Sequence, residues 1–170
     1  MESWENLVLF HNDPEGPDRY LGDLMEIALE GEEGVNWRAS WVVDKMNEKY
    51  PGVAEPWIRK IIEVLPEIRH HGKKRQFMRI LSTYEIPADS FSLVFDYSLE
   101  RLTDPGEAVA VKAHAMQILY NLCQMEPGLR EELVVTLEQE MELRPEPGII
   151  SRGRKLTARL RKEISSMKQA

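Results

Sequence analysis

The sequence predicts an all-α fold, an α-α superhelix formed as a right-handed solenoid of about four stacked helical hairpins, in a single domain over residues 1–170. Three observations predict it: an apolar stripe that recurs every 38 residues, a looser stripe between its copies, and Pro-Gly pairs between the helical segments. Helical stripes that repeat at this period are typical of proteins built from stacked two-helix units.

The stronger stripe begins with Ala39, Val42, Val43 and Met46, which are spaced as one face of a helix. Steps of 38 residues give three further sets, and fourteen of the sixteen positions are apolar or aromatic, Gly153 and Thr157 being the exceptions. The later sets are Phe77, Ile80, Leu81 and Tyr84; Ala115, Ile118, Leu119 and Leu122; and Gly153, Leu156, Thr157 and Leu160. We expect the central positions Val42, Ile80, Ile118 and Leu156 to be buried.

A second helical pattern lies between these stripes, so the repeating unit is predicted to be a pair of helices. It begins with Trp57, Ile58, Ile61 and Leu65, and Asp96 and Thr103 interrupt its next copy. The predicted helices are 18–30, 35–49, 55–69, 73–85, 88–102, 106–124, 128–143 and 149–167. The predicted units are 18–50, 51–86, 87–125 and 126–168, after an N-terminal cap and loop over 1–17 in which 3–11 form a short helix.

Two short motifs predict where particular helices end or begin. His70-His71-Gly72 combines cationic residues with a glycine, which is typical of a helix C-terminus. Asp104-Pro105-Gly106-Glu107 offers an N-cap, a proline at the first helical position and a glutamate at the third, which predicts a helix start.

The second helices resemble those of HEAT and armadillo-type repeats over about residues 18–167. The resemblance lies in Trp37-Arg38-Ala39-Ser40-Trp41-Val42 and Val111-Lys112-Ala113-His114-Ala115-Met116, where an apolar residue and a basic one precede small residues. It implies a scaffold that binds partners, with the second helices lining a concave face and the first helices a convex one. Gly34-Val35-Asn36 departs from the family by lacking the usual turn aspartate.

No catalytic signature is found in the sequence, so an enzyme, a metal and a cofactor are not predicted. His70 and His71 are adjacent and would point about 100° apart on a helix, and H-E-x-x-H and C-x-x-C are absent. Cys123 follows a core leucine, and runs such as Glu131-Glu132 are typical of solvated faces. The acidic N-terminus, the lack of a long apolar run and the single cysteine favour a cytoplasmic protein that does not enter a membrane.

Charge is segregated between the two kinds of helix, although the net charge of −7 by itself argues against a general nucleic-acid binder. The second-helix segments 35–50, 72–84, 108–124 and 149–168 hold 15 of the 22 Lys and Arg residues but only three of the 29 acids, a net +12 against −19 elsewhere. The 38-residue step aligns Trp41, Arg79, Gln117 and Lys155 in one column. The candidate partner-binding residues are Trp37, Trp41, Arg75, Arg79, Gln117, Asn121, Lys155 and Arg159.

These features favour a non-catalytic protein-binding or scaffold module that holds an acidic protein or peptide. A charged last helix also fits a solvated end of the array, and Trp37 and Trp41 also fit packing against a neighbouring helix. A nucleic-acid-binding protein is a second hypothesis. Among HEAT-like proteins are DNA glycosylases that use an aspartate, for which Asp44 is the one candidate in the basic segments. Self-association through an exposed end is the third.

Overall fold

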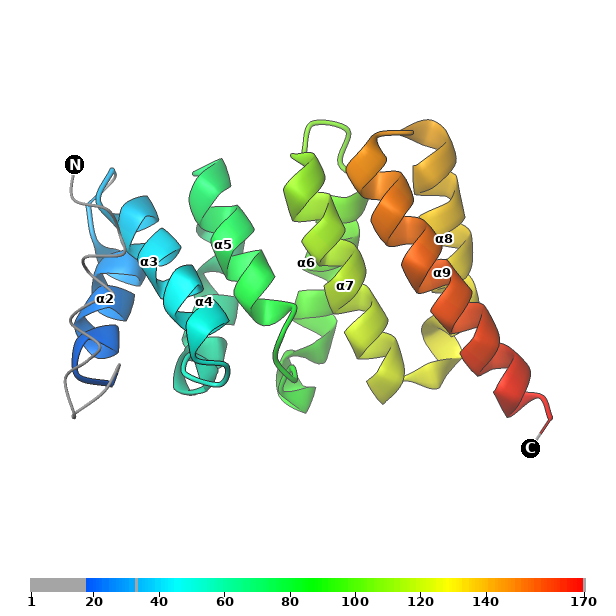
Figure 1. The fold of residues 1–170 in the computed structure, drawn as a ribbon, viewed down its shortest axis with the longest axis horizontal. Coiled ribbons are helices and arrows are strands. Elements are labelled where there is room, and N and C mark those ends of the chain that lie inside the picture. The colour runs from blue at the N-terminus through cyan, green and yellow to red at the C-terminus, as the bar shows by residue number, and fades with distance from the viewer. Residues whose placement is uncertain (1–17, 33, 170) are drawn as a thin grey trace. The chain divides into compact units, whose positions relative to one another are not determined.

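The computed structural model describes residues 18–32 and 34–169, which form eight α-helices joined by turns and short 3-10 segments (Figure 1). These described residues contain no strand, which confirms the all-α prediction. The chain divides into two compact units, Met1–Ile80 and Leu81–Ala170. The single domain stays a prediction, and the helix predicted at 3–11 lies outside the described residues.

The described residues of the first unit form four α-helices, and the first two of these pack against each other as a hairpin. Gly34 and Gly52, in the turns before and after the second of these helices, have φ values of 95° and 98°, a region that favours glycine. The elements are α2 (Asp18–Glu30), α3 (Asn36–Lys49), η2 (Glu55–Trp57), α4 (Ile58–Val64), η3 (Leu65–Glu67) and α5 (His71–Leu81).

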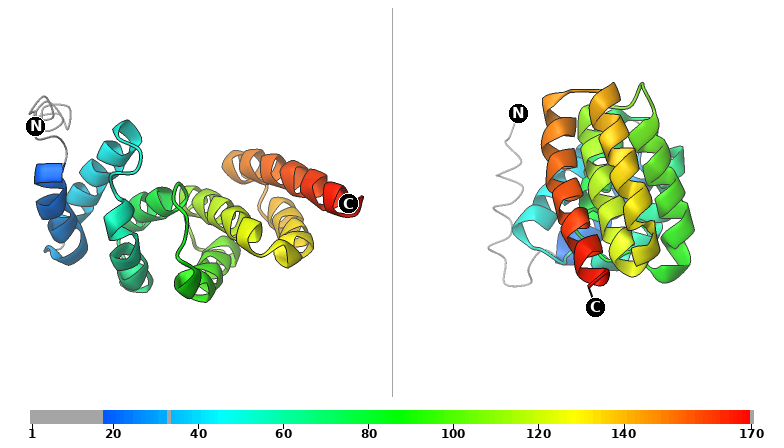
Figure 2. Two further views of the ribbon diagram at one scale, coloured as in Figure 1. Left: turned by 90° about the horizontal axis from the view of Figure 1, so that it is seen from below. Right: turned by 90° about the vertical axis from the view of Figure 1, so that its right-hand side faces the viewer.

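The second unit consists of two hairpins, α6 with α7 and α8 with α9, and α7 also packs against α9. Figure 2 shows α7 and α9 in one layer and α6 and α8 in the other. The second helix of each predicted pair therefore lies on the same side of this unit. The elements are η4 (Ala88–Ser90), α6 (Phe91–Thr103), α7 (Val109–Met125), η5 (Pro127–Leu129), α8 (Arg130–Leu143) and α9 (Pro147–Met167).

The 38-residue stripe forms the core of both units. Val42, Ile80, Ile118 and Leu156 are all buried, as predicted, and of the sixteen stripe positions only Tyr84 is half-buried. Gly153, one of the two stripe positions that are not apolar, is required by packing, since a Cβ atom there would lie 2.6 Å from the Sδ atom of Met141 on α8. Glycine therefore lets α8 and α9 approach closely.

The helix predicted over 55–69 ends earlier, and the assignment of His70-His71-Gly72 to its C-terminus is wrong. Pro66 has no N–H to continue the helix, and the Leu65 N–H bonds to Ile62 in 3-10 fashion before the backbone becomes extended at Ile68. The histidines instead precede and open α5, where the Lys73 N–H donates to His70 Nδ1 at 3.2 Å.

The predicted helix start at Asp104 is also wrong, because this motif closes a turn. The Gly106 N–H donates to Asp104 Oδ1 at 2.8 Å, and α7 begins only at Val109. Glu107 is buried beside Arg101, 3.3 Å from its guanidinium, which holds the glutamate outside the helix. Whereas α7 begins later than predicted, α9 begins two residues earlier, because Pro147 fits the first turn of a helix.

Candidate functional site

The candidate residues lie on α3 and α5 in the first unit and on α7 and α9 in the second. In the first unit, the Trp37 ring stacks on His70 with a centroid distance of 5.3 Å and an angle of 11°. The Arg38 guanidinium lies 5.5 Å from the Trp37 ring centroid. Trp37 and Trp41 are both half-buried. Trp37 thus contributes to packing between α3 and the start of α5 and keeps part of its surface exposed.

Arg79 belongs to a compensated charge cluster and is not a free positive group. Its guanidinium lies 2.9 Å from Asp44 and 2.8 Å from Glu48, and Lys45 lies 2.6 Å from Glu48. Burial raises the pKa of the Asp44 carboxyl although Arg79 opposes the shift, and hydrogen bonds from Lys45 and Arg79 lower the pKa of Glu48. Two acids therefore balance two bases in this cluster.

The sequence contained a signal for this cluster. Arg79 occupies the same repeat position as Trp41, and Asp44 and Glu48 follow Trp41 by three and seven residues, on the same helix face. Asp44 is only 4% exposed and faces Arg79, so the aspartate of the glycosylase hypothesis is enclosed in an ion pair. Arg75, in contrast, is exposed and has no ion-pair partner among the described residues.

Three of the lysines counted in the second helices are buried, and two of these cap the ends of first helices. Lys73 Nζ donates to the Leu29 carbonyl of α2 at 3.2 Å, and Lys112 Nζ donates to the Leu102 carbonyl of α6 at 3.0 Å. Burial lowers the pKa of both ammonium groups. These lysines satisfy carbonyl groups at helix C-termini and add no charge to the surface.

In the second unit, Gln117 and Asn121 belong to a chain of hydrogen bonds. Arg152 donates to Gln117 Oε1 at 2.8 Å, Gln117 donates to Asn121 Oδ1 at 2.9 Å, and Asn121 donates to the Ser82 carbonyl at 3.0 Å. This series of hydrogen bonds connects α9 with α7, and α7 with Ser82, the residue that follows α5. These two amides therefore fix helices relative to each other within the unit.

The exposed side of α9 carries positive charges that form no ion pair with the described residues. Lys155 and Arg159 are both exposed, as are Arg154, directly before Lys155, and Lys162, three residues after Arg159. None of the four has an ion-pair partner among the described residues. We define the α9 basic face as Arg154, Lys155, Arg159 and Lys162.

Other charged groups of α9 are paired. Arg161 lies 2.5 Å from Glu138 and Lys168 lies 2.8 Å from Glu131, both on α8. The one acid of α9, Glu163, accepts a hydrogen bond from the Tyr120 hydroxyl at 2.6 Å, which raises the pKa of that phenol. These three charged groups therefore contact residues of α7 and α8.

Metal ligands and the cysteine thiol are the reactive groups to consider among the described residues. No group of three His, Cys, Asp or Glu side chains there could hold a metal ion. Cys123 is buried, which raises the pKa of its thiol to about 11, so at neutral pH it is a protonated core residue. None of the helices described has the length and apolar character needed to cross a bilayer.

Comparison with known proteins agrees with this architecture. A family model described as a HEAT repeat domain matches residues 12–160, which is most of the chain. No curated protein matches the chain, and no solved structure does.

Proposed function

Because this chain belongs to the HEAT repeat domain family, we propose that it is a non-catalytic module that holds an acidic segment of a partner protein against its second helices. The α9 basic face is the main contact in this proposal, with Arg75, Trp37 and Trp41 as further contacts. The right-handed superhelical arc that would join these residues into one concave surface is part of the proposal. The cytoplasmic location expected from the sequence is also part of the proposal.

The observation that carries the proposal is the uncompensated charge of α9. Lys155 and Arg159 are four residues apart and Lys162 is three further on, so like charges are neighbours on one helix face. Such pairs destabilise a helix by roughly 0.2–0.5 kcal/mol each. Arg79, Arg161 and Lys168 form ion pairs with acids, whereas the residues of the α9 basic face form none with the described residues. A carboxylate-rich ligand would supply the missing partners.

The test measures the fluorescence anisotropy of a labelled sixteen-residue peptide of alternating Glu and Ser, with a Gln-Ser peptide as its uncharged counterpart. The Glu peptide should bind and the Gln peptide should not. The double variant Lys155→Glu, Arg159→Glu should weaken binding about tenfold or more, which corresponds to about 1.4 kcal/mol. A lack of binding of the Glu peptide at low salt would refute the proposal.

A matched control changes the same number of charges, one on α9 and one directly after its end. Arg161→Glu with Lys168→Glu alters residues paired with α8 at the edge of the face, and this variant should bind the Glu peptide much more tightly than the first. Duplex DNA serves as a competing ligand. If DNA binds more tightly than the peptide, with a steep dependence of log K on log salt, the nucleic-acid hypothesis replaces the proposed one.

A further inference from the structure

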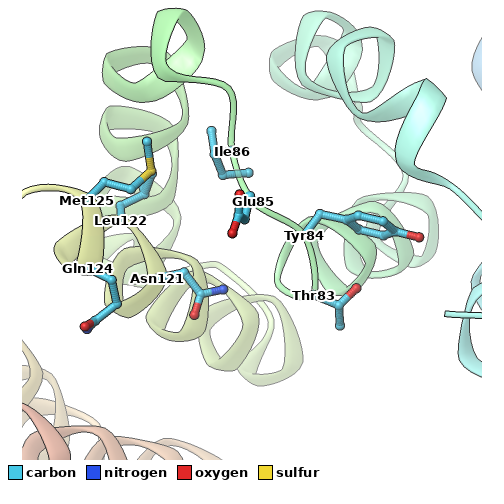
Figure 3. A pocket seen from close by; sticks show the side chains of 8 residues that line it. All are labelled: Thr83, Tyr84, Glu85, Ile86, Asn121, Leu122, Gln124 and Met125. Carbon is cyan, nitrogen blue, oxygen red and sulfur yellow. The ribbon is translucent and has the colours of Figure 1, made fainter. Parts of the chain in front are cut away.

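A second surface of the chain, on the other side of α7 from α9, has the opposite chemistry. A cavity of about 480 Å³ lies within the second unit, between the α5–α6 connector and the C-terminal end of α7. Figure 3 shows connector side chains on one side of it and α7 side chains on the other, with the Tyr84 ring directed away from α7. Its walls include Glu85, Ile86, Asn121, Leu122, Gln124 and Met125.

No lysine or arginine lines this cavity, and its fixed charges are negative. Glu85 is exposed and has no ion-pair partner among the described residues. The cavity also lies at the C-terminal end of α7, where the last carbonyl groups carry partial negative charge. A cation is therefore favoured here and an anion is disfavoured.

Three of the other lining residues, Ile86, Leu122 and Met125, are aliphatic. Ile86 and Leu122 are buried, while Met125 is 45% exposed at the edge of the cavity. The Asn121 amide, bonded to the Ser82 carbonyl at 3.0 Å, joins the two sides of the cavity at its base. An apolar wall that leads to a carboxylate fits a side chain with an aliphatic stem and a cationic head. An uncharged apolar side chain would instead desolvate Glu85 without compensation.

We propose that this cavity receives a lysine or arginine side chain from a segment of a partner protein, with the stem along Met125 and Ile86 and the head beside Glu85. The inference rests on the proposal that the chain binds protein segments, but it concerns a different surface and the opposite charge. A partner segment would then be recognised by a basic anchor residue at the cavity as well as by acidic residues at the α9 basic face.

The test is a titration of the full chain, labelled with ¹⁵N, with the peptide Ac-Ala-Leu-Lys-Leu-Ala-NH₂. Backbone amide signals of Glu85, Ile86 and Met125 should shift in a saturable manner. A peptide with norleucine in place of lysine keeps the stem but lacks the ammonium group, and it should bind about fivefold or more weakly. Equal binding of the two peptides, or a lack of shifts at these residues, would overturn the inference.

Two variants with a matched control identify the groups responsible. Glu85→Gln should weaken binding of the lysine peptide about fivefold or more, and Met125→Ala should also weaken it. Glu142→Gln removes another exposed acid, on α8, and should leave the affinity unchanged. An unchanged affinity in Glu85→Gln would also overturn the inference.

The two proposals can fail separately. Lys155→Glu with Arg159→Glu should not weaken binding of the lysine peptide, because those residues lie on α9 and do not line the cavity. A chain that fails to bind the Glu-Ser peptide could still bind the lysine peptide, and a chain that fails to bind the lysine peptide could still bind the Glu-Ser peptide.

Discussion

Replacing Ile118 with alanine tests the core that the 38-residue stripe predicts. Ile118 is fully buried on α7, which packs against α6, α8 and α9. The substitution removes three carbon atoms from a site with no exposure, which costs about 2.4 kcal/mol of transfer free energy at ~0.8 kcal/mol per group. Because helices on several sides limit collapse around the cavity, we expect a total loss of about 2–5 kcal/mol.

The assay is urea unfolding followed by two signals that report on different parts of the chain. All four tryptophans lie before residue 58, so their fluorescence reports on the first unit, whereas far-UV circular dichroism reports on both. The Ile118→Ala change should lower the dichroism midpoint. Val135→Ala, at a residue 52% exposed on α8, is the control and should cost less than about 0.5 kcal/mol. A loss below about 1 kcal/mol for Ile118→Ala would refute the packing argument.

Two further predictions concern buried groups. Lys112→Met should destabilise the chain by about 1–3 kcal/mol at pH 7, because the Leu102 carbonyl loses its donor. Burial lowers the pKa of Lys112 below its ordinary value of 10.5, so between these two pKa values the unfolded chain binds more protons than the folded one. Wild type should therefore gain stability over the variant as pH rises from 7 to 10, and a constant difference in urea titrations would contradict this. Burial raises the pKa of the Cys123 thiol to about 11. The thiol should therefore react with an aromatic disulfide reagent at least about a hundredfold more slowly in the folded chain than in urea. Rapid labelling of Cys123 without denaturant would instead place the thiol at the surface.

The core could be predicted from the sequence because burial follows helical spacing. Fifteen of the sixteen stripe positions are buried, including Gly153 and Thr157, which interrupt the apolar pattern. Each stripe repeats local spacing, and a helix with one apolar face must bury that face against another helix. Helix ends were predicted less well, since they depend on competition between local bonds. His70 and Asp104 each form such a bond outside the helix that the sequence assigned to them.

The candidate site was predicted only in part, because counting charges along a helix does not give the direction of each side chain. Lys73 and Lys112 were counted as surface charge, yet both reach buried carbonyl groups of first helices. Arg79 lies on the predicted column, but Asp44 and Glu48 compensate it. The cavity beside Glu85 had no signal in the sequence, since its walls come from two segments about 35 residues apart.

The sequence by itself determined the all-α class, the pairing of helices and the residues of the core, because these follow from local periodicity and the burial of apolar surface. Only the tertiary structure decided which charges remain available for binding. Whether a lysine caps a helix, as Lys112 does, or faces solvent, as Lys155 does, depends on which neighbouring element lies within reach of its long side chain. That reach is a property of three-dimensional packing, and the two lysines look alike in the sequence.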